Sequence, residues 1–311
     1  MAYVGIDIGG TKCAVVKGDL NGITEKIRFD TVGLDETLTK IFDAVGRLLP
    51  ADAIGVSCGG PLDERSGVIM SPPNLHGWDN IPITDMLTER FGIPAYLCND
   101  ANASALAEWK FGAGRGVSNM IFLTFGTGLG AGLILGGRLY SGTSGMAGEV
   151  GHVRLSEGDG PVGFGKRGSF EGYCSGGGIK QLAQIFATRR LEDGEPIPWA
   201  DNEGKISKLT TKYVAELAKG GDPFALEIFE ESAKRLGEGL SILIDILNPE
   251  RIVIGSVYAR CVELFYPKMM EVIRREALAK SVAECEILPA ELGEQIGDYA
   301  ALTVAMKGNE E

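Results

Sequence analysis

The sequence predicts an α/β fold made of two related domains, and three observations support that prediction. Two glycine-containing loops each follow a short apolar run directly, and each leads into another strand-like run. The order strand, strand, strand, helix, strand, helix then recurs in the two halves of the chain. With 311 residues, 44% of them hydrophobic, the chain is long enough to bury two cores. We therefore expect a duplicated architecture with nucleotide in a cleft between the two domains.

The first third of the chain alternates strands and helices. The helix at 34–49 is predicted because apolar residues recur there at helical spacing, as at Leu34, Leu38 and Ile41. The expected strands are Val4–Ile8, Cys13–Gly18, Thr24–Thr31, Ala53–Cys58 and Ala95–Cys98. The expected helices are Leu34–Leu49, Thr84–Phe91 and Ala101–Lys110. The glycines of Gly112–Gly116 then indicate a hinge.

The later part of the chain repeats this order. The expected strands are Asn119–Phe125, Gly132–Leu135, Arg138–Tyr140, Arg251–Gly255 and Glu284–Leu288. The expected helices are Phe224–Leu247, Val262–Ala279 and Asp298–Met306. Five glycines and Pro161 indicate an irregular loop over Gly158–Gly168. We place a smaller domain at 1–115, a larger one at 116–297, and a last helix, about 298–308, that packs back on the first domain.

Charge and composition exclude several classes of function. The net charge of −12 argues against a nucleic-acid-binding surface, which needs clustered Lys and Arg. No run approaches the roughly 20 apolar residues of a membrane span, and the start of the chain lacks a signal peptide, so we expect a cytoplasmic protein without a membrane partner. The six cysteines form no C-x-x-C pair, and two histidines are too few for a His-rich metal site.

Both glycine loops have the pattern of phosphate-binding hairpins. The first spans Gly9, Gly10, Thr11 and Lys12, and the second contains Gly126, Thr127, Gly128 and Gly130. Glycines leave backbone N–H groups bare, so that a polyphosphate can approach them closely. Asp7 ends the strand before the first loop, where a carboxylate could hold Mg²⁺ directly or through water. Glycines that only turn the chain are the alternative for either loop alone.

The second loop also fits the G-x-G-x-x-G/A dinucleotide fingerprint. A dinucleotide site needs a helix after the glycines, with its N-terminus facing the pyrophosphate. The residues that follow, 132–140, form two short apolar runs about a Gly-Gly turn and indicate a hairpin instead. A nucleotide hairpin is therefore favoured over a dinucleotide fold.

A candidate acceptor site lies between the two loops. Asn99 and Asp100 stand where a strand turns into a helix, so Asp100 is either a helix cap or a catalytic carboxylate. A second polar cluster, Glu149, His152 and Glu171, favours the catalytic alternative. Amide, carboxylate and imidazole groups suit a polyhydroxyl ligand, because each hydroxyl both donates and accepts hydrogen bonds.

These motifs together resemble the ROK sugar kinases of the actin-like, hexokinase-like superfamily, whose fold is related to ribonuclease H. The resemblance covers essentially the whole chain. It rests on DIGGTK at 7–12, NDAN at 99–102, FGTGLGAG at 125–132, GEVGH at 148–152, G-S-F-E-x-x-x-S at 168–175 and LNPERIVIG at 247–255. Each motif is common alone, but six in this order are specific.

The resemblance implies an ATP-dependent kinase that phosphorylates a hexose with the help of Mg²⁺. Asp100 would be the general base that takes the proton of a sugar hydroxyl. The sugar-binding positions of the family correspond to Gly60, Asn74, Asn99, Asp100, Glu149, His152 and Glu171. The nucleotide would lie on Asp7, both glycine loops and Gly255, and Asp7 would hold Mg²⁺. The partners would be small molecules only, and we expect a homodimer.

Two departures from the family pattern matter. Family members usually bind a structural zinc with the histidine and three cysteines, at positions that here are Val162, Phe164 and Ser169. We therefore expect no zinc site. Phe164 would replace the metal by apolar packing, and His152 has a purely structural role as its alternative. The second departure is Ser256 after Gly255, where a further glycine is usual, and it leaves the adenine contacts open.

The substrate and the activity have alternatives. Glucose, at its 6-hydroxyl, is the first expectation, with mannose, fructose, allose, N-acetylmannosamine and N-acetylglucosamine as rivals. The family also contains repressors with an N-terminal helix-turn-helix, for which six residues before Asp7 leave no room in this sequence. A non-catalytic sugar sensor is the other alternative, and the presence of both Asp7 and Asp100 argues against it.

Overall fold

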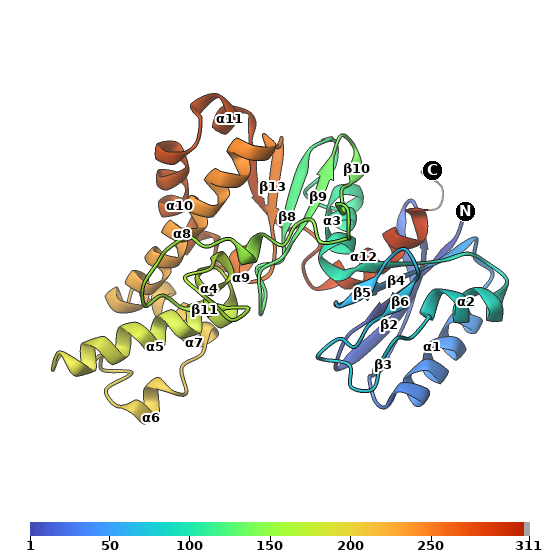
Figure 1. Cartoon of the computed structure of the whole chain (residues 1–311), viewed down its shortest axis with the longest axis horizontal. Helices are drawn as coiled ribbons and strands as arrows, with labels where there is room; N and C mark the ends of the chain where they lie inside the picture. Colours follow the sequence, from blue (N-terminus) through green and yellow to red (C-terminus); the bar gives the residue numbers. More distant parts are fainter. Residues whose placement is uncertain (308–311) are drawn as a thin grey trace. The chain divides into compact units, whose positions relative to one another are not determined.

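The structure is a computed structural model and describes residues 1–307 (Figure 1). Contacts within the chain divide it into two compact units. Unit 1 consists of residues 1–122, 132–147 and 291–311, and unit 2 of residues 123–131 and 148–290. Residue 308, the expected end of the last helix, lies outside the described residues.

The first five-stranded sheet lies in unit 1 and has the strand order β3-β2-β1-β4-β7. Strand β1 pairs antiparallel with β2 and parallel with β4. Strand β2 pairs antiparallel with β3, and β4 pairs parallel with β7. The strands are β1 (Tyr3–Ile8), β2 (Lys12–Asp19), β3 (Gly22–Asp30), β4 (Ala53–Cys58) and β7 (Ala95–Asn99). Short strands β5 (Leu62–Asp63) and β6 (Val68–Ile69) form a separate hairpin.

Helices cover both faces of this sheet, because side chains along its strands alternate between the two faces. Val4, Ile6 and Ile8 of β1 join one apolar core with helices α1 (Leu34–Leu48) and α2 (Ile83–Phe91). Tyr3 of β1 joins a second core with α12 (Ile296–Met306). Glycines let α12 approach closely: a Cβ added at Gly5 would lie 2.5 Å from the backbone N of Leu302. Helix α3 (Asp100–Phe111) also packs against α12.

The second sheet repeats the strand order of the first, as β10-β9-β8-β13-β14. Its strands are β8 (Met120–Leu123), β9 (Ala131–Leu135), β10 (Arg138–Leu139), β13 (Arg251–Ile254) and β14 (Glu286–Pro289). In both sheets the first three strands of the repeat are consecutive in the chain and the last two follow helices. The predicted α/β fold and its duplication are therefore confirmed.

Helices make up most of unit 2. Helix α8 (Pro223–Leu247) packs along α10 (Val262–Glu276), and Gly237 permits the contact, since its added Cβ would lie 2.7 Å from the Cβ of Val272. The other helical segments of unit 2 are η1 (Val150–His152), α4 (Phe170–Tyr173), α5 (Gly176–Glu192), α6 (Glu203–Ile206), α7 (Thr211–Lys219), α9 (Ser256–Arg260) and α11 (Ala279–Glu284). A short hairpin joins β11 (Val162–Gly163) to β12 (Lys166–Arg167). It lies within the predicted irregular loop.

The units do not divide the chain at a single point between residues 115 and 116, where the sequence suggested a boundary. Residues 132–147 belong with unit 1, because a Cβ added at Gly132 would lie 2.8 Å from the carbonyl of Ala101 in α3. Arg65 also donates to the carbonyl of Thr143 at 3.0 Å. The chain returns to unit 1 at residue 291, before η2 (Gly293–Gln295) and α12.

Candidate functional site

The first glycine loop is a tight turn between β1 and β2. The N–H of Gly9 donates to the carbonyl of Lys12 at 3.2 Å, and the hydroxyl of Thr31 donates to the carbonyl of Gly9 at 2.6 Å. Gly10 lies against Asn74, so closely that an added Cβ would lie 2.6 Å from the Asn74 carbonyl oxygen. The loop thus adjoins the predicted pocket residue Asn74 and leaves Gly10, Thr11 and Lys12 exposed.

Asp7 is the last residue but one of strand β1, opposite Ala14 and Ser57 of the neighbouring strands. The pKa of its carboxyl group is raised to about 6, mainly by burial and also by the negative charges of Asp298 and Asp100, while Lys26 and Arg28 oppose the rise. The carboxylates of Asp7, Asp100 and Asp298 therefore concentrate negative charge near the end of β1. Such surroundings favour the binding of a cation at Asp7.

Asp298 was not predicted as a site residue. It is 5% exposed, lies in the first turn of α12 and forms an ion pair with Lys26 of β3. The α12 backbone touches Asp7 directly, since a Cβ at Gly297 would lie 2.5 Å from the Asp7 Oδ2. The sequence offers only an acid at a helix start, which also reads as an ordinary helix cap.

Asn99 and Asp100 share the junction of β7 and α3. Asn99 is the N-cap residue, and its side-chain oxygen accepts from the N–H of Ala101 at 3.0 Å. Asp100 is the first helical residue, and its Oδ1 accepts from the same N–H at 2.8 Å. The capping role that the sequence offered to Asp100 therefore belongs mainly to Asn99.

Water reaches the carboxylate of Asp100, although protein atoms crowd around it. Desolvation by these atoms raises the pKa of Asp100, and the bond from Ala101 partly offsets the effect. The loop after β4 lies beside this group: a Cβ at Gly59 would be 3.7 Å from the Asp100 Oδ2, and one at Gly60 would be 3.6 Å from the Asn99 Nδ2. An accessible carboxylate with a raised pKa can accept a proton from a bound hydroxyl.

Glu64 is a second residue that the sequence did not single out. Its Oε1 accepts from the backbone N–H of Asn99 at 2.9 Å and from the Asn102 side chain at 3.3 Å. Its Oε2 lies 3.7 Å from the amine of Lys307, at the end of α12. Glu64 therefore ties the loop after β5 to the segment that carries Asp100. Its spacing from NDAN along the chain gives no sign of this contact.

The second glycine loop, in unit 2, is held by its own backbone. Thr124 and Gly130 exchange hydrogen bonds at 3.0 Å, and the N–H of Gly126 donates to the carbonyl of Gly128 at 3.0 Å. Strand β9 follows directly, so the predicted hairpin is confirmed and the dinucleotide alternative, which needs a helix here, is excluded. Thr127 at the tip is exposed.

Two further segments contact this loop. The N–H of Gly176, at the start of α5, donates to the carbonyl of Gly126 at 2.7 Å. Gly255 is buried and donates to the carbonyl of Leu123 at 2.9 Å, while Ser256 has a φ of 49°. This left-handed backbone explains why the family places a glycine where this chain has Ser256. Helix α5 was missed from the sequence because three glycines, which usually break helices, open it.

Glu171 lies against the second glycine loop. Its Oε2 accepts from the N–H of Leu129 at 3.0 Å, and a Cβ added at Gly128 would lie 2.7 Å from the same oxygen. Gly151 contacts the Cβ of Glu171 from the other side, since its added Cβ would lie 3.2 Å away. The structure therefore brings Glu171 next to both the glycine loop and the GEVGH segment, and the contact with the glycine loop was not predicted from the sequence.

Glu149 is the N-cap of the short helix η1 and His152 is its last residue, and both residues are exposed. The backbone N–H of His152 donates to the carbonyl of Glu149 at 3.2 Å, which sets the spacing of the two side chains. The imidazole of His152 packs on the ring of Phe164, with centroids 4.9 Å apart.

The residues near His152 do not fit a zinc ion. Val162 and Phe164 have hydrocarbon side chains. The buried Ser169 hydroxyl is already used, because it donates to the Gly163 carbonyl at 3.3 Å and accepts from the Gly172 N–H at 3.1 Å. Within residues 1–307, no group of three or more His, Cys, Asp or Glu side chains is placed to hold a metal ion.

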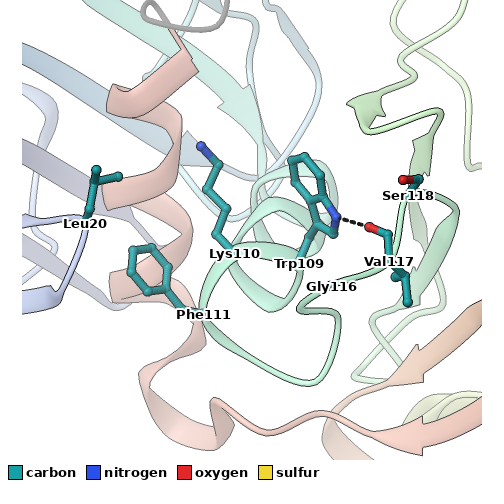
Figure 2. A pocket seen from close by; sticks show the side chains of 7 residues that line it. All are labelled: Leu20, Trp109, Lys110, Phe111, Gly116, Val117 and Ser118. Carbon is teal, nitrogen blue, oxygen red and sulfur yellow. Dashed lines mark hydrogen bonds between the residues drawn. The ribbon is translucent and has the colours of Figure 1, made fainter.

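A hollow of about 470 Å³ lies elsewhere in unit 1 and contains none of the predicted site residues. Figure 2 shows its lining, in which the Trp109 indole donates to the carbonyl of Val117 at 2.7 Å. The lining residues are Leu20, Trp109, Lys110, Phe111, Gly116, Val117 and Ser118. No helix within residues 1–307 is long and apolar enough to cross a membrane.

Comparison with known proteins agrees with this geometry. A glucokinase from Halalkalibacterium halodurans is 33% identical over 95% of this chain and 92% of its own. A xylose repressor from Caldicellulosiruptor bescii is 30% identical over 89% of this chain and 71% of its own. The solved structure of a ROK family glucokinase from Streptomyces griseus, in complex with glucose and AMPPNP, covers 99% of this chain and 100% of its own, with 31% identity and a TM-score of 0.76.

The pattern of the ROK family matches residues 3–307, which is nearly the whole of the chain. The match includes both glycine loops, the junction that carries Asp100 and the segment from Glu149 to Glu171. The chain belongs to the ROK family.

Proposed function

We propose that this protein is an ATP-dependent sugar kinase that transfers a phosphoryl group to a hexose, with glucose at its 6-hydroxyl as the first candidate. The observation that carries the proposal is the carboxylate of Asp100, which is open to water yet has a raised pKa, next to Asn99 and Gly60. The glucokinase relatives support the same activity.

In this proposal Asp100 orients the attacking hydroxyl and accepts its proton. Phosphoryl transfer passes through a loose transition state, so positioning and charge contribute more than removal of the proton. Gly60, Asn74 and Asn99 of unit 1 would line the sugar site. Glu149, His152 and Glu171 are further candidates for hydrogen bonds to sugar hydroxyls, on the resemblance to the family.

ATP would be held by backbone N–H groups of the two glycine loops, with Gly255 near the adenosine. The charge around Asp7 fits a divalent cation, because Asp298 and Asp100 add negative charge there. Bound Mg²⁺ would neutralise charge on the phosphates as it develops. Asp7 would hold this ion directly or through water, and Lys26 would limit the repulsion between the carboxylates.

Two alternatives are kept. The substrate could be another hexose or N-acetylhexosamine, namely mannose, fructose, allose, N-acetylmannosamine or N-acetylglucosamine. The protein could instead be a non-catalytic sugar sensor, since xylose repressors are among its relatives. The raised pKa of Asp100 favours catalysis, because a sensor needs no proton acceptor.

A coupled assay of ADP release tests the proposal. Purified protein is supplied with ATP, Mg²⁺ and each sugar of a panel of hexoses and N-acetylhexosamines in turn, and phosphorus NMR identifies the hydroxyl that is modified. We expect turnover with at least one sugar and a kcat at least about 10²-fold lower with the Asp100→Asn variant. Sugar binding by calorimetry without ADP release from any sugar would support the sensor instead. A homodimer and a cytoplasmic location stay predictions, and sedimentation analysis tests the first.

A further inference from the structure

The β11–β12 hairpin, residues 162–167, contains a residue that folding alone does not explain. Phe164 and Gly165 form its two-residue turn, with φ values of 50° and 72°. Left-handed backbone at both positions suits Asn or Gly and is unfavourable for a bulky side chain. Phe164 is also 75% exposed, so its ring adds little to a buried core. A strained and exposed phenylalanine calls for another reason.

The reason we find is its contact with His152. The rings of Phe164 and His152 have centroids 4.9 Å apart and planes inclined by 51°. From the same hairpin, the amine of Lys166 donates to the backbone carbonyl of His152 at 2.7 Å. One side chain thus restrains the imidazole and the other restrains the backbone that carries it.

Residues outside the hairpin restrain its backbone. Gln181 of α5 binds both polar groups of Val162, accepting from its N–H at 2.9 Å and donating to its carbonyl at 2.8 Å. Ser169 donates to the carbonyl of Gly163, and a Cβ added at Gly163 would lie 2.8 Å from the Cβ of Glu171. Because the hairpin is restrained in this way, Phe164 and Lys166 can hold His152 in one position, which the same side chains on a mobile loop could not do.

We propose that the 162–167 hairpin is a metal-free clasp for His152, in which Phe164 and Lys166 are positioning residues that hold the imidazole ready for the sugar. Apolar packing and hydrogen bonds here do the work that a zinc ion does where the cysteines are present. The inference rests on the proposed function, in which His152 contacts the sugar.

The first experiment reads the clasp directly and needs no sugar. The chain has only two histidines, His76 and His152, so proton NMR of tag-free protein gives two sets of imidazole signals. The His76→Gln variant assigns them. We expect Phe164→Gly to move the His152 signal and leave that of His76 in place, because the ring current of Phe164 is lost. Phe164→Tyr keeps the ring and is expected to keep the signal.

The second experiment separates positioning from stability. Phe164→Gly is expected to raise the sugar KM about threefold to tenfold, the range for an aromatic contact, while kcat changes little. The Tm is expected to change little, since relief of the left-handed strain is offset by the larger chain entropy of glycine. Phe164→Tyr should restore the KM. Lys166→Met should also raise the KM, while Lys212→Met, a change at an exposed lysine of α7, should not.

The outcomes distinguish this inference from the proposed function. An unmoved His152 signal in Phe164→Gly, or a moved signal with an unchanged sugar KM, would overturn the clasp while kinase activity stands. Elemental analysis that finds about one zinc per chain after dialysis would overturn its metal-free character. If the wild-type protein binds and phosphorylates no sugar, the proposed function fails and the positioning role fails with it, while the NMR result still reports the contact.

Discussion

The two glycine loops follow the same path from strand to strand, but their surroundings differ. The loop of residues 9–12 has Asp7, Asp100 and Asp298 close behind it, and the burial of Asp7, together with repulsion by the other two carboxylates, raises the pKa of Asp7 to about 6. The loop of residues 124–130 is shaped by hydrogen bonds among its own backbone groups and by the contact of Leu129 with Glu171.

This difference teaches that one backbone motif can serve two purposes. In unit 1 the loop adjoins a site whose charge and proton affinity are tuned by burial. In unit 2 the loop provides shape and positions a single acceptor, Glu171. Four predictions test this division, from the largest expected effect to the smallest.

The largest effect is expected from Asp100→Asn. Asparagine can still accept the hydrogen bond of Ala101 but cannot take a proton, so kcat should fall about 10²-fold to 10⁴-fold with sugar binding nearly unchanged. The coupled assay gives kcat and calorimetry gives the affinity. Asp85→Asn is the matched control, because Asp85 is an exposed first-turn acid of α2. A variant that keeps more than about a tenth of kcat would contradict the role of Asp100 as base.

The charge behind the first loop predicts a pH dependence of stability. The pKa of Asp7 is raised to about 6 in the folded state, from an ordinary value of 3.8, so the folded protein binds this proton more tightly than the unfolded chain does. The stability from this group is fully present below about pH 4 and is lost as pH rises through about 6, by up to about 3 kcal/mol.

Urea unfolding of the metal-free protein at a series of pH values measures this effect. The free energy of unfolding of Asp7→Asn, relative to that of the wild type, should rise between about pH 4 and pH 6. Asp19→Asn in β2 serves as a control on the same sheet, and its difference from the wild type should stay level. A level difference for Asp7→Asn as well would show that neither burial nor the neighbouring carboxylates raise the pKa of Asp7 in the folded protein.

Replacing one glycine of each loop by alanine should affect two different properties: the stability for the first loop and the sugar KM for the second. At Gly10 the new Cβ meets the backbone carbonyl of Asn74, which cannot move freely, so Gly10→Ala should lower the free energy of unfolding by about 1–3 kcal/mol. At Gly128 it meets only the end of the Glu171 side chain. Gly128→Ala should therefore keep its stability and raise the sugar KM, because the carboxylate is displaced from Leu129.

Gly33→Ala is the control for both variants, because Gly33 has a φ of −61° and open space around it. Thermal unfolding measures the stability of the three variants, and sugar kinetics measure their KM. Equal losses of stability at Gly10 and Gly128 would mean that the two loops are constrained alike.

The smallest effect is expected at Glu64. Glu64→Ala removes the acceptor for Asn99 and Asn102, and kcat/KM should fall about tenfold as the Asp100 segment loosens. Glu64→Gln keeps a carbonyl acceptor and should stay within about threefold of the wild type. Asp63→Ala is the neighbouring control, since Asp63 bonds only to Arg65 and Ser66 in the hydrogen bonds described for it. If Glu64→Ala has normal kinetics, Asn99 alone suffices to orient Asp100.

Local pattern decided most of the fold. Each strand of the two five-stranded sheets was predicted within a few residues, because β-strands and amphipathic helices leave apolar residues at their own periods. The hairpin after the second glycine loop was likewise predicted, from the two short apolar runs about a Gly-Gly turn at 132–140. Helix α5 was missed, because its glycines are tolerated only where their N–H groups find the carbonyls of the second loop.

The sequence also proposed candidate chemistry-bearing residues, but it did not indicate their surroundings. Asp7, Asp100 and Glu171 stand in motifs whose spacing is local, so the sequence by itself determined which groups are available. The contacts that set their properties join distant segments: Asp298 to Asp7, Glu64 to Asn99, and Phe164 to His152. Only the tertiary structure decided these, because burial, charge repulsion and ring packing depend on distances in space that spacing along the chain does not encode.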